Sequence, residues 1–222
     1  VMPRTSPKPT FTPRNPISPG LMWKRNAKKF LDACQQYLWS QYGEVVRSFL
    51  HGKGLSDNII KNAGIGWNES DIFLEREDWG LPSMLNEKKN LKKLWLPLGL
   101  VIPCFLDDEI VRLRIRRPVQ NDEPRYIVTA GSDMRNMIWN PDNKYIVIVE
   151  SELDGLLLLQ EAGDLVGVIA MGSAQAKPDV RAHESLIKTE KILVSLDTDA
   201  AGARAAWHFW PKLYGDKVIR WP

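Results

Sequence analysis

The sequence has few of the residues that build zinc sites and disulfide frameworks. Among its 222 residues there are only two cysteines, Cys34 and Cys104, and three histidines. The cysteines lie far apart, no CxxC pair occurs, and no histidine stands at zinc-ligand spacing. We therefore expect no zinc site within this chain.

Long apolar runs and any strong excess of charge are also missing. The longest apolar runs, such as residues 146–149 and 156–159, are far shorter than the about 20 residues of a membrane helix, and no signal peptide opens the sequence. These absences predict a cytoplasmic protein without a membrane partner. The 30 Lys and Arg residues nearly balance the 27 Asp and Glu residues, so evidence for a nucleic-acid partner has to be local.

The overall composition is that of an ordinary globular protein, and the sequence divides into three parts. Residues 1–20 contain six prolines and scattered basic residues, which is typical of an extended linker. Residues 21–142 predict a helical and basic β subdomain, and residues 143–222 predict an alternating α/β domain. Because the sequence begins in a linker, we expect a further domain upstream.

The middle part changes its hydrophobic period. Apolar residues recur at helical spacing between residues 22 and 50, and Ser56 is placed to cap a short helix over residues 57–62. Between residues 94 and 128 the period is two, which predicts short antiparallel strands with Asp107 and Asp108 in a hairpin turn.

The last part alternates strands and helices. Its apolar runs lack polar alternation, which indicates strands that are covered on both faces, hence a mostly parallel central sheet with flanking helices. The expected strands are residues 146–149, 165–170, 192–196 and 217–221, and the expected helices are residues 153–162, 178–188 and 200–213.

Acidic residues follow two of these strands. Glu150 comes directly after the first strand, and Asp197 and Asp199 follow the third. Carboxyl ends of parallel strands meet at one edge of a sheet, so these carboxylates are candidates for a Mg²⁺ or Mn²⁺ site, with Asp154 as a further ligand. A bound divalent cation would suit phosphoryl chemistry. The alternative is that Asp199 only caps the following helix and that Glu150 and Asp154 cap the helix before Gln160, and spacing alone does not decide between the two.

Three segments, in order, resemble the motifs of Toprim domains and in particular of DnaG-type primases. They are residues 147–154 (Val-Ile-Val-Glu-Ser-Glu-Leu-Asp), 170–173 (Ala-Met-Gly-Ser) and 196–202 (Leu-Asp-Thr-Asp-Ala-Ala-Gly). The resemblance implies an α+β N-terminal subdomain followed by an α/β Toprim domain that continues beyond Pro222. It also implies that Glu150, Asp197 and Asp199 are catalytic and, with Asp154, hold the metal. Ser151 departs from the family, which has Gly there.

Upstream basic residues resemble the same family. Arg117 and the run Pro124-Arg125-Tyr126 are similar to its arginine and Pro-Lys-Tyr sequence, with Arg in place of Lys. The resemblance implies that Arg117 and Arg125 bind phosphates of template and nucleotide. An arginine at position 125 keeps the charge and adds a bidentate donor.

Three further arginines alternate along one expected strand. Arg112, Arg114 and Arg116 share a face, with about 6.6 Å between successive side chains, which suits a row of contacts to a phosphate backbone. The other interpretation is a solvated or edge-protecting face. The family likeness favours nucleic-acid binding.

These observations predict a DNA primase core that synthesises short RNA primers on single-stranded DNA by metal-dependent nucleotidyl transfer. Its expected partners are the single-stranded template, ribonucleoside triphosphates and a replicative helicase, separate or fused. Two alternatives remain: a Toprim nuclease or topoisomerase-like enzyme, and a catalytically inactive module that binds single-stranded nucleic acid.

Overall fold

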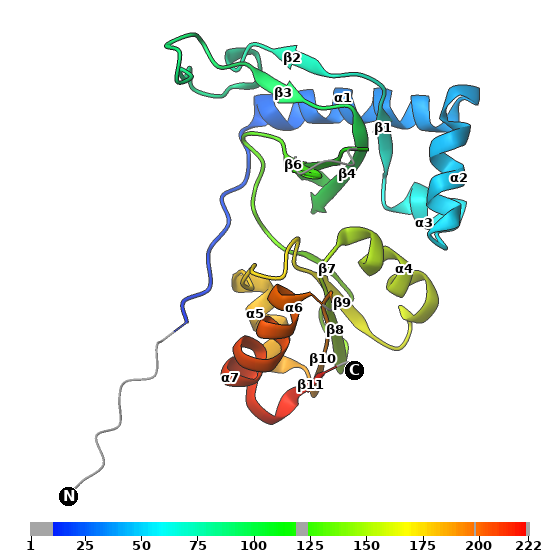
Figure 1. Cartoon of the computed structure of the whole chain (residues 1–222), viewed down its shortest axis with the longest axis vertical. Helices are drawn as coiled ribbons and strands as arrows, with labels where there is room; N and C mark the ends of the chain where they lie inside the picture. The colour runs from blue at the N-terminus through cyan, green and yellow to red at the C-terminus, as the bar shows by residue number, and fades with distance from the viewer. Residues whose placement is uncertain (1–10, 119–123, 198, 221–222) are drawn as a thin grey trace, which may run out of the picture. The chain divides into compact units, whose positions relative to one another are not determined.

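The computed structural model describes residues 11–118, 124–197 and 199–220 (Figure 1). The described chain forms two compact units. One comprises Ile17–Met134, and the other comprises residues 135–220 together with residues 11–16. We call them the N-terminal unit and the C-terminal unit, and each is described separately.

A four-stranded antiparallel sheet forms the centre of the N-terminal unit. Its long hairpin turns at Asp107 and Asp108, whose φ angles are 49° and 64°. Short polar side chains tolerate this left-handed region, so the predicted hairpin turn is confirmed. The strands, in the order β1-β4-β5-β6, are β1 (Gly66–Asn68), β4 (Gly99–Leu106), β5 (Glu109–Arg116) and β6 (Tyr126–Val128).

Helix α1 (Leu21–Trp39) packs its apolar stripe against this sheet. Trp23, Ala27 and Leu31 are almost completely buried at four-residue spacing, which places them on one helix face. The partners in the sheet include Val101, Leu113 and Ile115. At Gly66 a Cβ atom would lie 2.6 Å from the Cβ of Cys34, so only glycine lets β1 approach α1 this closely.

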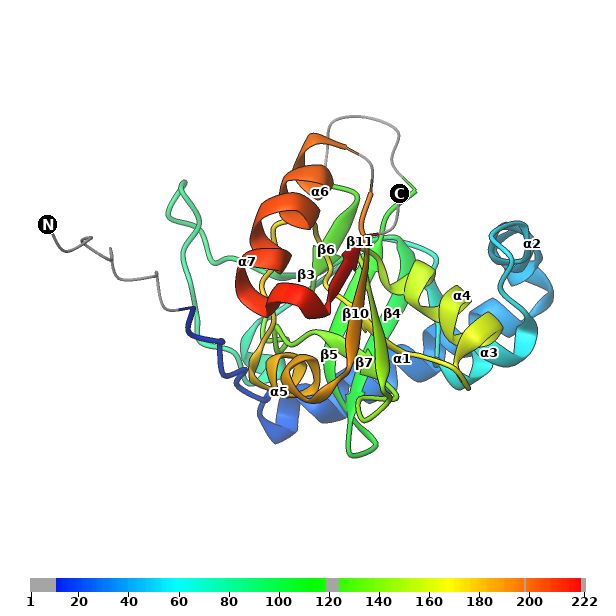
Figure 2. The ribbon, with the colours of Figure 1, turned by 90° about the horizontal axis from the view of Figure 1, so that it is seen from below.

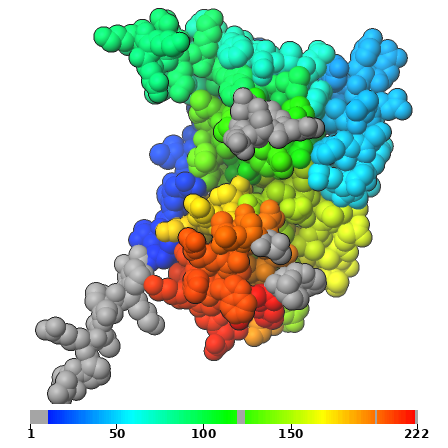
Figure 3. All heavy atoms as spheres, viewed as in Figure 1, coloured from blue at the N-terminus to red at the C-terminus, as the bar shows by residue number. Residues whose placement is uncertain are grey.

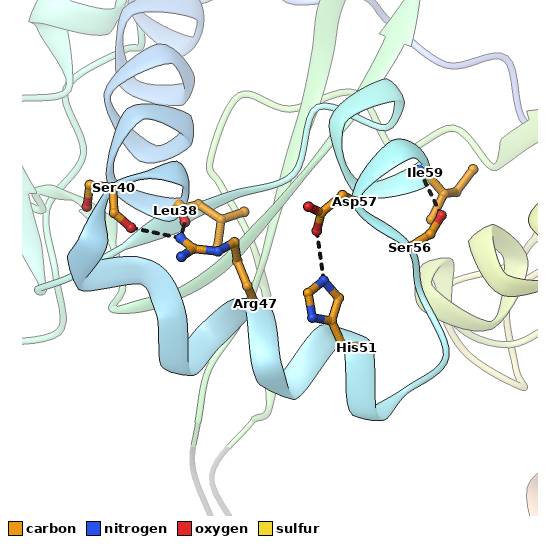
Figure 4. A network of polar contacts seen from close by, with 7 residues as sticks. All are labelled: Leu38, Ser40, Arg47, His51, Ser56, Asp57 and Ile59. Carbon is orange, nitrogen blue, oxygen red and sulfur yellow. Dashed lines mark hydrogen bonds and ion pairs between the residues drawn. The ribbon is translucent and has the colours of Figure 1, made fainter.

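Polar contacts connect the helices that follow α1 (Figure 4). They are α2 (Glu44–Gly52) and α3 (Asp57–Asn62). Arg47 donates to the carbonyl oxygens of Leu38, in the last turn of α1, and of Ser40, which follows the helix, and so satisfies acceptors that the end of a helix leaves open. His51 Nε2 lies 2.7 Å from Asp57 Oδ1, and Ser56 accepts from the N–H of Ile59, so the predicted cap of the short helix is confirmed.

A second, smaller sheet and a short helical turn complete the N-terminal unit. The strands β2 (Ile72–Leu74) and β3 (Leu94–Leu96) pair antiparallel, and Phe73 stacks on Trp95 with ring centroids 6.4 Å apart. The 3₁₀ turn η2 (Glu77–Trp79) lies between β2 and β3 in the sequence, and the 3₁₀ turn η1 (Gln41–Gly43) lies between α1 and α2.

A five-stranded mixed sheet forms the centre of the C-terminal unit. Strand β8 pairs in parallel with both β9 and β10, β10 pairs in parallel with β11, and β7 pairs antiparallel with β9. The order is β11-β10-β8-β9-β7, with β7 (Met137–Trp139), β8 (Tyr145–Val149), β9 (Gly167–Ala170), β10 (Lys191–Ser195) and β11 (Val218–Arg220). The sequence predicts that this domain begins at residue 143, but strand β7, which precedes that residue, belongs to the same sheet, and the main segment of the unit begins at Arg135.

Helices cover both faces of this sheet. In Figures 1 and 2, α4 (Glu152–Ala162) lies on one face, and α5 (Val180–Lys188) and α7 (Trp210–Tyr214) lie on the other. Ile148, Ile169 and Ile192 from the strands pack with Leu186 of α5 and Trp210 of α7. All five side chains are at most 1% exposed, which explains the unbroken apolar strands of the sequence.

The helix expected over residues 200–213 is interrupted. It consists of α6 (Ala200–Arg204), a π-helical turn η3 (Ala205–Phe209) and α7, followed by the 3₁₀ turn η4 (Gly215–Lys217). Pro211 lacks the N–H group that a continuous α-helix would use at this position. A π turn of this kind is rare and is often found at functional sites.

Part of the proline-rich segment belongs to the C-terminal unit. Phe11 packs edge-on against His183 and Phe209, with ring centroids 5.5 and 6.0 Å apart. The carbonyl of Arg14 accepts the N–H of Val180 at the start of α5. Residues 11–16 of the expected linker therefore pack against the C-terminal unit, whereas residues 1–10 lie outside the described part of the chain.

The described chain is thus a mixed α/β structure with several sheets. None of its described helices has the length and apolar character needed to cross a membrane.

Candidate active site

The two strand ends that carry the candidate acids adjoin. Val149, the last residue of β8, pairs in parallel register with Ser195, the last residue of β10. Glu150 therefore leaves the sheet next to the loop that carries Asp197 and Asp199. The sequence prediction that these two strand ends meet is confirmed.

Glu150 has an uncompensated carboxylate oxygen. Its Oε2 atom is buried and has no hydrogen-bond partner among the described residues. Burial, followed by the negative charge of Asp197 and more weakly that of Asp199, raises the pKa of Glu150. The backbone N–H groups of Ala174 and Asp197 act in the opposite direction. A positive charge beside Oε2 would offset both the cost of burying the carboxylate and its repulsion by Asp197 and Asp199.

The start of α4 is capped by Ser151 and not by the acids around it. The Ser151 hydroxyl accepts the N–H of Asp154 and donates to Asp154 Oδ2 over 2.6 Å. The interpretation of Glu150 as a helix cap is therefore wrong. Serine at this position orients Asp154, whose side chain is exposed, and leaves Glu150 without a capping role.

Asp199 does cap a helix. Its Oδ1 atom accepts the N–H groups of Ala201, at 2.9 Å, and Gly202, at 2.8 Å. The capping interpretation of Asp199 is therefore confirmed. Only one of its two carboxylate oxygens is used in this way, and Oδ2 makes no hydrogen bond to a described residue.

Gly202 explains the glycine of the Asp-x-Asp-x-Ala-Gly pattern. A Cβ atom at this position would lie 2.0 Å from the carbonyl oxygen of Asp197. No real side chain tolerates that distance, so glycine is required for α6 to lie against the loop that carries the two aspartates. The motif therefore encodes the approach of helix and loop as well as the carboxylates.

These acids fit a divalent cation only in part. The described residues contain no group of three or more His, Cys, Asp and Glu side chains gathered closely enough to hold a metal ion. Glu150 Oε2 fits a cation best, since it is buried, lacks a partner and faces the charge of Asp197.

The arginines of β5 do not form the solvated face that one interpretation of the sequence predicts. Arg112 and Arg114 are 5% and 8% exposed, and β5 lies between β4 and β6, so it is not an edge strand either. The guanidinium of Arg114 lies 4.1 Å from the ring centre of Tyr126. The solvated and edge-protecting interpretations of Arg112 and Arg114 are therefore wrong.

The remaining basic candidates lie together. Arg116, Arg117 and Arg125 line one cavity of about 440 Å³ in the N-terminal unit, with Phe49 and Trp67 among the apolar lining residues. The carbonyl of Arg125 accepts the N–H of Arg117. No acidic side chain lines this cavity among the described residues.

Two aromatic partners of these arginines were missed by sequence reasoning. The guanidinium of Arg116 lies 5.0 Å from the ring centre of Phe49, and that of Arg117 lies 5.0 Å from the ring of Trp95. Such stacking orients a guanidinium without neutralising it. The sequence held no signal for these pairs, because aromatic residues in such number are also expected in the core.

No protein-family model matches the sequence, and no curated protein matches it. Solved structures match at the level of the fold. A DNA primase domain from Pseudomonas aeruginosa has a TM-score of 0.66 at 17% identity, over 90% of this chain and 71% of that one. The Escherichia coli primase catalytic core has a TM-score of 0.64 at 17% identity, over 91% of this chain and 72% of that one.

A further similar structure is a DnaG primase catalytic domain bound to single-stranded DNA. Its TM-score is 0.64 at 16% identity, over 90% of this chain and 73% of that one. The chain therefore has the fold of a DnaG-type primase catalytic core.

Proposed function

We propose that this chain is a DNA primase core that makes short RNA primers on single-stranded DNA by divalent-metal-dependent nucleotidyl transfer. The observation that carries the proposal is the buried, partnerless Oε2 of Glu150 beside Asp197, at the meeting point of two paired strand ends. The proposed substrates are a single-stranded DNA template and ribonucleoside triphosphates, and the proposed partner is a replicative helicase.

The C-terminal unit is proposed to be a Toprim domain. Three of the four strand pairings in its sheet are parallel, which supports a mostly parallel topology, and the acids follow β8 and β10 as the motif resemblance implies. The shared fold with primase catalytic cores supports the same assignment.

Glu150, Asp197 and Asp199 are the proposed holders of Mg²⁺ or Mn²⁺, with Asp154 as an accessory acid. The chemistry that such a cation supplies is charge neutralisation while a primer 3′ hydroxyl attacks the α-phosphorus of a nucleotide and pyrophosphate leaves. Asp199 has Oδ2 available while Oδ1 caps α6. Glu150 contributes a carboxylate that is already desolvated, so its attraction to a cation is stronger than in open water.

The basic residues are proposed to hold phosphates. Arg116, Arg117 and Arg125 line a cavity without acidic lining residues, and the stacking of Arg117 on Trp95 holds its guanidinium in place. Arg112 and Arg114 belong to the same strand, and their burial leaves little of their surface for direct contact with phosphate.

The substitution Asp197→Asn tests the catalytic part. We expect it to abolish Mg²⁺- or Mn²⁺-dependent primer formation on single-stranded DNA with labelled ribonucleotides, because it removes a metal-binding charge while preserving shape. Asp164→Asn is the matched control. Asp164 is exposed and precedes the amino end of β9, whereas the candidate acids follow the carboxyl ends of β8 and β10. Circular dichroism should show the same fold in both variants. Priming by Asp197→Asn at the wild-type rate would refute the proposal.

A second candidate function is that of a catalytically inactive module that binds single-stranded nucleic acid. The lack of a three-ligand group among the described residues is compatible with it. Titration with Mn²⁺ separates the two, because a primase core binds the ion and an inactive module does not. Incubation with labelled DNA and Mg²⁺ but without nucleotides also tests for a nuclease, which would cut the DNA.

A further inference from the structure

A second cavity lies in the C-terminal unit beside the loop that carries the acids, since Ala200 and Ala201, which directly follow Asp199, are among its lining residues. It has a volume of about 670 Å³ and is lined by the loop after β9 and by the segment from α6 to α7. Four of its lining residues carry basic side chains, and no lining residue is acidic. The basic residues are Lys177, Arg204, His208 and Lys212. We call this cavity the basic pocket.

The cations of the basic pocket are not neutralised within the described chain. Lys177, Arg204 and Lys212 form no ion pair with a described carboxylate, and all three are exposed. Residues 200–215 contain no Asp or Glu at all. Figure 3 shows the α6–α7 segment, in orange, on the surface of the molecule. Unpaired positive charge on one face of a protein attracts anions from solution.

Three of these side chains form a row along the helical segment. Arg204, His208 and Lys212 follow one another at intervals of four residues. In a regular α-helix each such step drifts by about 40° around the axis. The π turn η3 holds extra residues per turn and counteracts this drift, so that all three side chains line one pocket. At about 1.5 Å of rise per residue the row spans about 12 Å, far longer than a single phosphate.

The small residues that line the basic pocket let a ligand approach its backbone closely. Most of its other lining residues are alanines, whose small side chains leave the space beneath the cations open. Phe209 adds an aromatic ring, which lies 6.0 Å from the Nζ atom of Lys177. A floor of this kind suits a thin, extended ligand.

We propose that the basic pocket binds the phosphate backbone of a single nucleic-acid strand. The choice of a nucleic-acid strand as the anion rests on the proposed function, whereas the cations and the length of the row are independent of it. Arg204 and Lys212 each neutralise one phosphate, and Lys177 contacts the strand from the opposite wall. A free nucleotide offers the same phosphate chemistry, but its phosphates adjoin one another, whereas those of a strand are spaced along the row.

The double variant Arg204→Gln/Lys212→Gln tests this proposal. Binding of a fluorescent single-stranded oligonucleotide is measured in EDTA at several salt concentrations, so that neither metal nor catalysis is needed. Each lost phosphate contact lowers the salt slope of log K by about 0.7 and weakens binding about 5-fold at 0.1 M salt. We therefore expect the slope to fall by about 1.4 and the affinity by about 25-fold.

The matched control is Arg181→Gln/Lys188→Gln on α5, which removes the same two residue types from exposed positions outside the pocket. The control should bind like the wild type. Equal affinities for the wild type and the Arg204/Lys212 variant, or equal losses in both variants, would overturn the proposal. A wild type that does not bind the oligonucleotide would also overturn it, whatever the outcome of the priming assay. A loss confined to a labelled ribonucleoside triphosphate would replace the strand with a nucleotide.

Discussion

Neutralising Glu150 should stabilise the metal-free protein. In Glu150→Gln the buried oxygen no longer carries charge toward Asp197 and Asp199, and the amide is nearly isosteric with the carboxylate. The amide still places a polar atom at the position of Oε2, so only the cost of the charge is relieved, and for a half-buried group we take about 1 kcal/mol, the upper end for interactions between partly exposed charges. That corresponds to a rise of the thermal midpoint by about 2–4 °C for a chain of this size.

The pH dependence of this effect follows from the raised pKa of Glu150. Because the folded protein holds the proton more tightly than the unfolded chain, the wild type loses stability as the pH rises above the ordinary value of 4.5. The Gln variant lacks this loss. The difference in midpoint should therefore be absent below about pH 4 and complete at pH 7.

Adding the metal should reverse the order. At a free Mg²⁺ concentration of ten times its dissociation constant, the wild type gains about 1.4 kcal/mol, and the variant, without the ligand charge, gains almost none. Differential scanning fluorimetry with and without Mg²⁺ measures both effects, with Glu161→Gln at an exposed position as the control. If Glu150→Gln has a lower midpoint than the wild type in EDTA, Oε2 is not an uncompensated charge and the reasoning fails.

Three further predictions test other parts of the structure. Gly202→Ala should abolish Mn²⁺ binding in a titration although it removes no carboxylate, because its Cβ displaces the Asp197 carbonyl, and unchanged binding would contradict the close approach. Burial lowers the pKa of His183 from 6.5, so the free energy of unfolding should fall as the pH drops below that value, and His183→Gln should flatten this slope in urea titrations. Leu31→Ala should cost about 2–5 kcal/mol in urea unfolding of the N-terminal unit, and a loss below 1 kcal/mol would show that α1 does not hold the core.

The elements that sequence reasoning predicted well are those with strong local signals. Ser56 marks the start of a helix whose bounds, Asp57–Asn62, match the expected residues, because a cap and the following turn are local interactions. The apolar runs that become β8 and β10 were recognised because burial on both faces leaves a continuous hydrophobic signature.

Features that depend on distant contacts could not be predicted. Alternation along β5 showed which side of the strand carries Arg112 and Arg114, but it contains no information on whether that side is covered. The docking of Phe11 depends on His183 and Phe209, which are far away in the chain. The π turn leaves no local signal except Pro211, which is equally compatible with the first turn of a new helix.

The candidate acids show why helix capping and metal binding need not be alternatives. A carboxylate has two oxygens, and at Asp199 the helix uses only Oδ1, so the cap holds the side chain at the strand end and leaves Oδ2 for a cation. At the other strand end Ser151 takes the capping role and Glu150 is left with a buried, partnerless oxygen. The helices therefore position the acids, and the negative charge that remains at Glu150 is what a bound cation would neutralise.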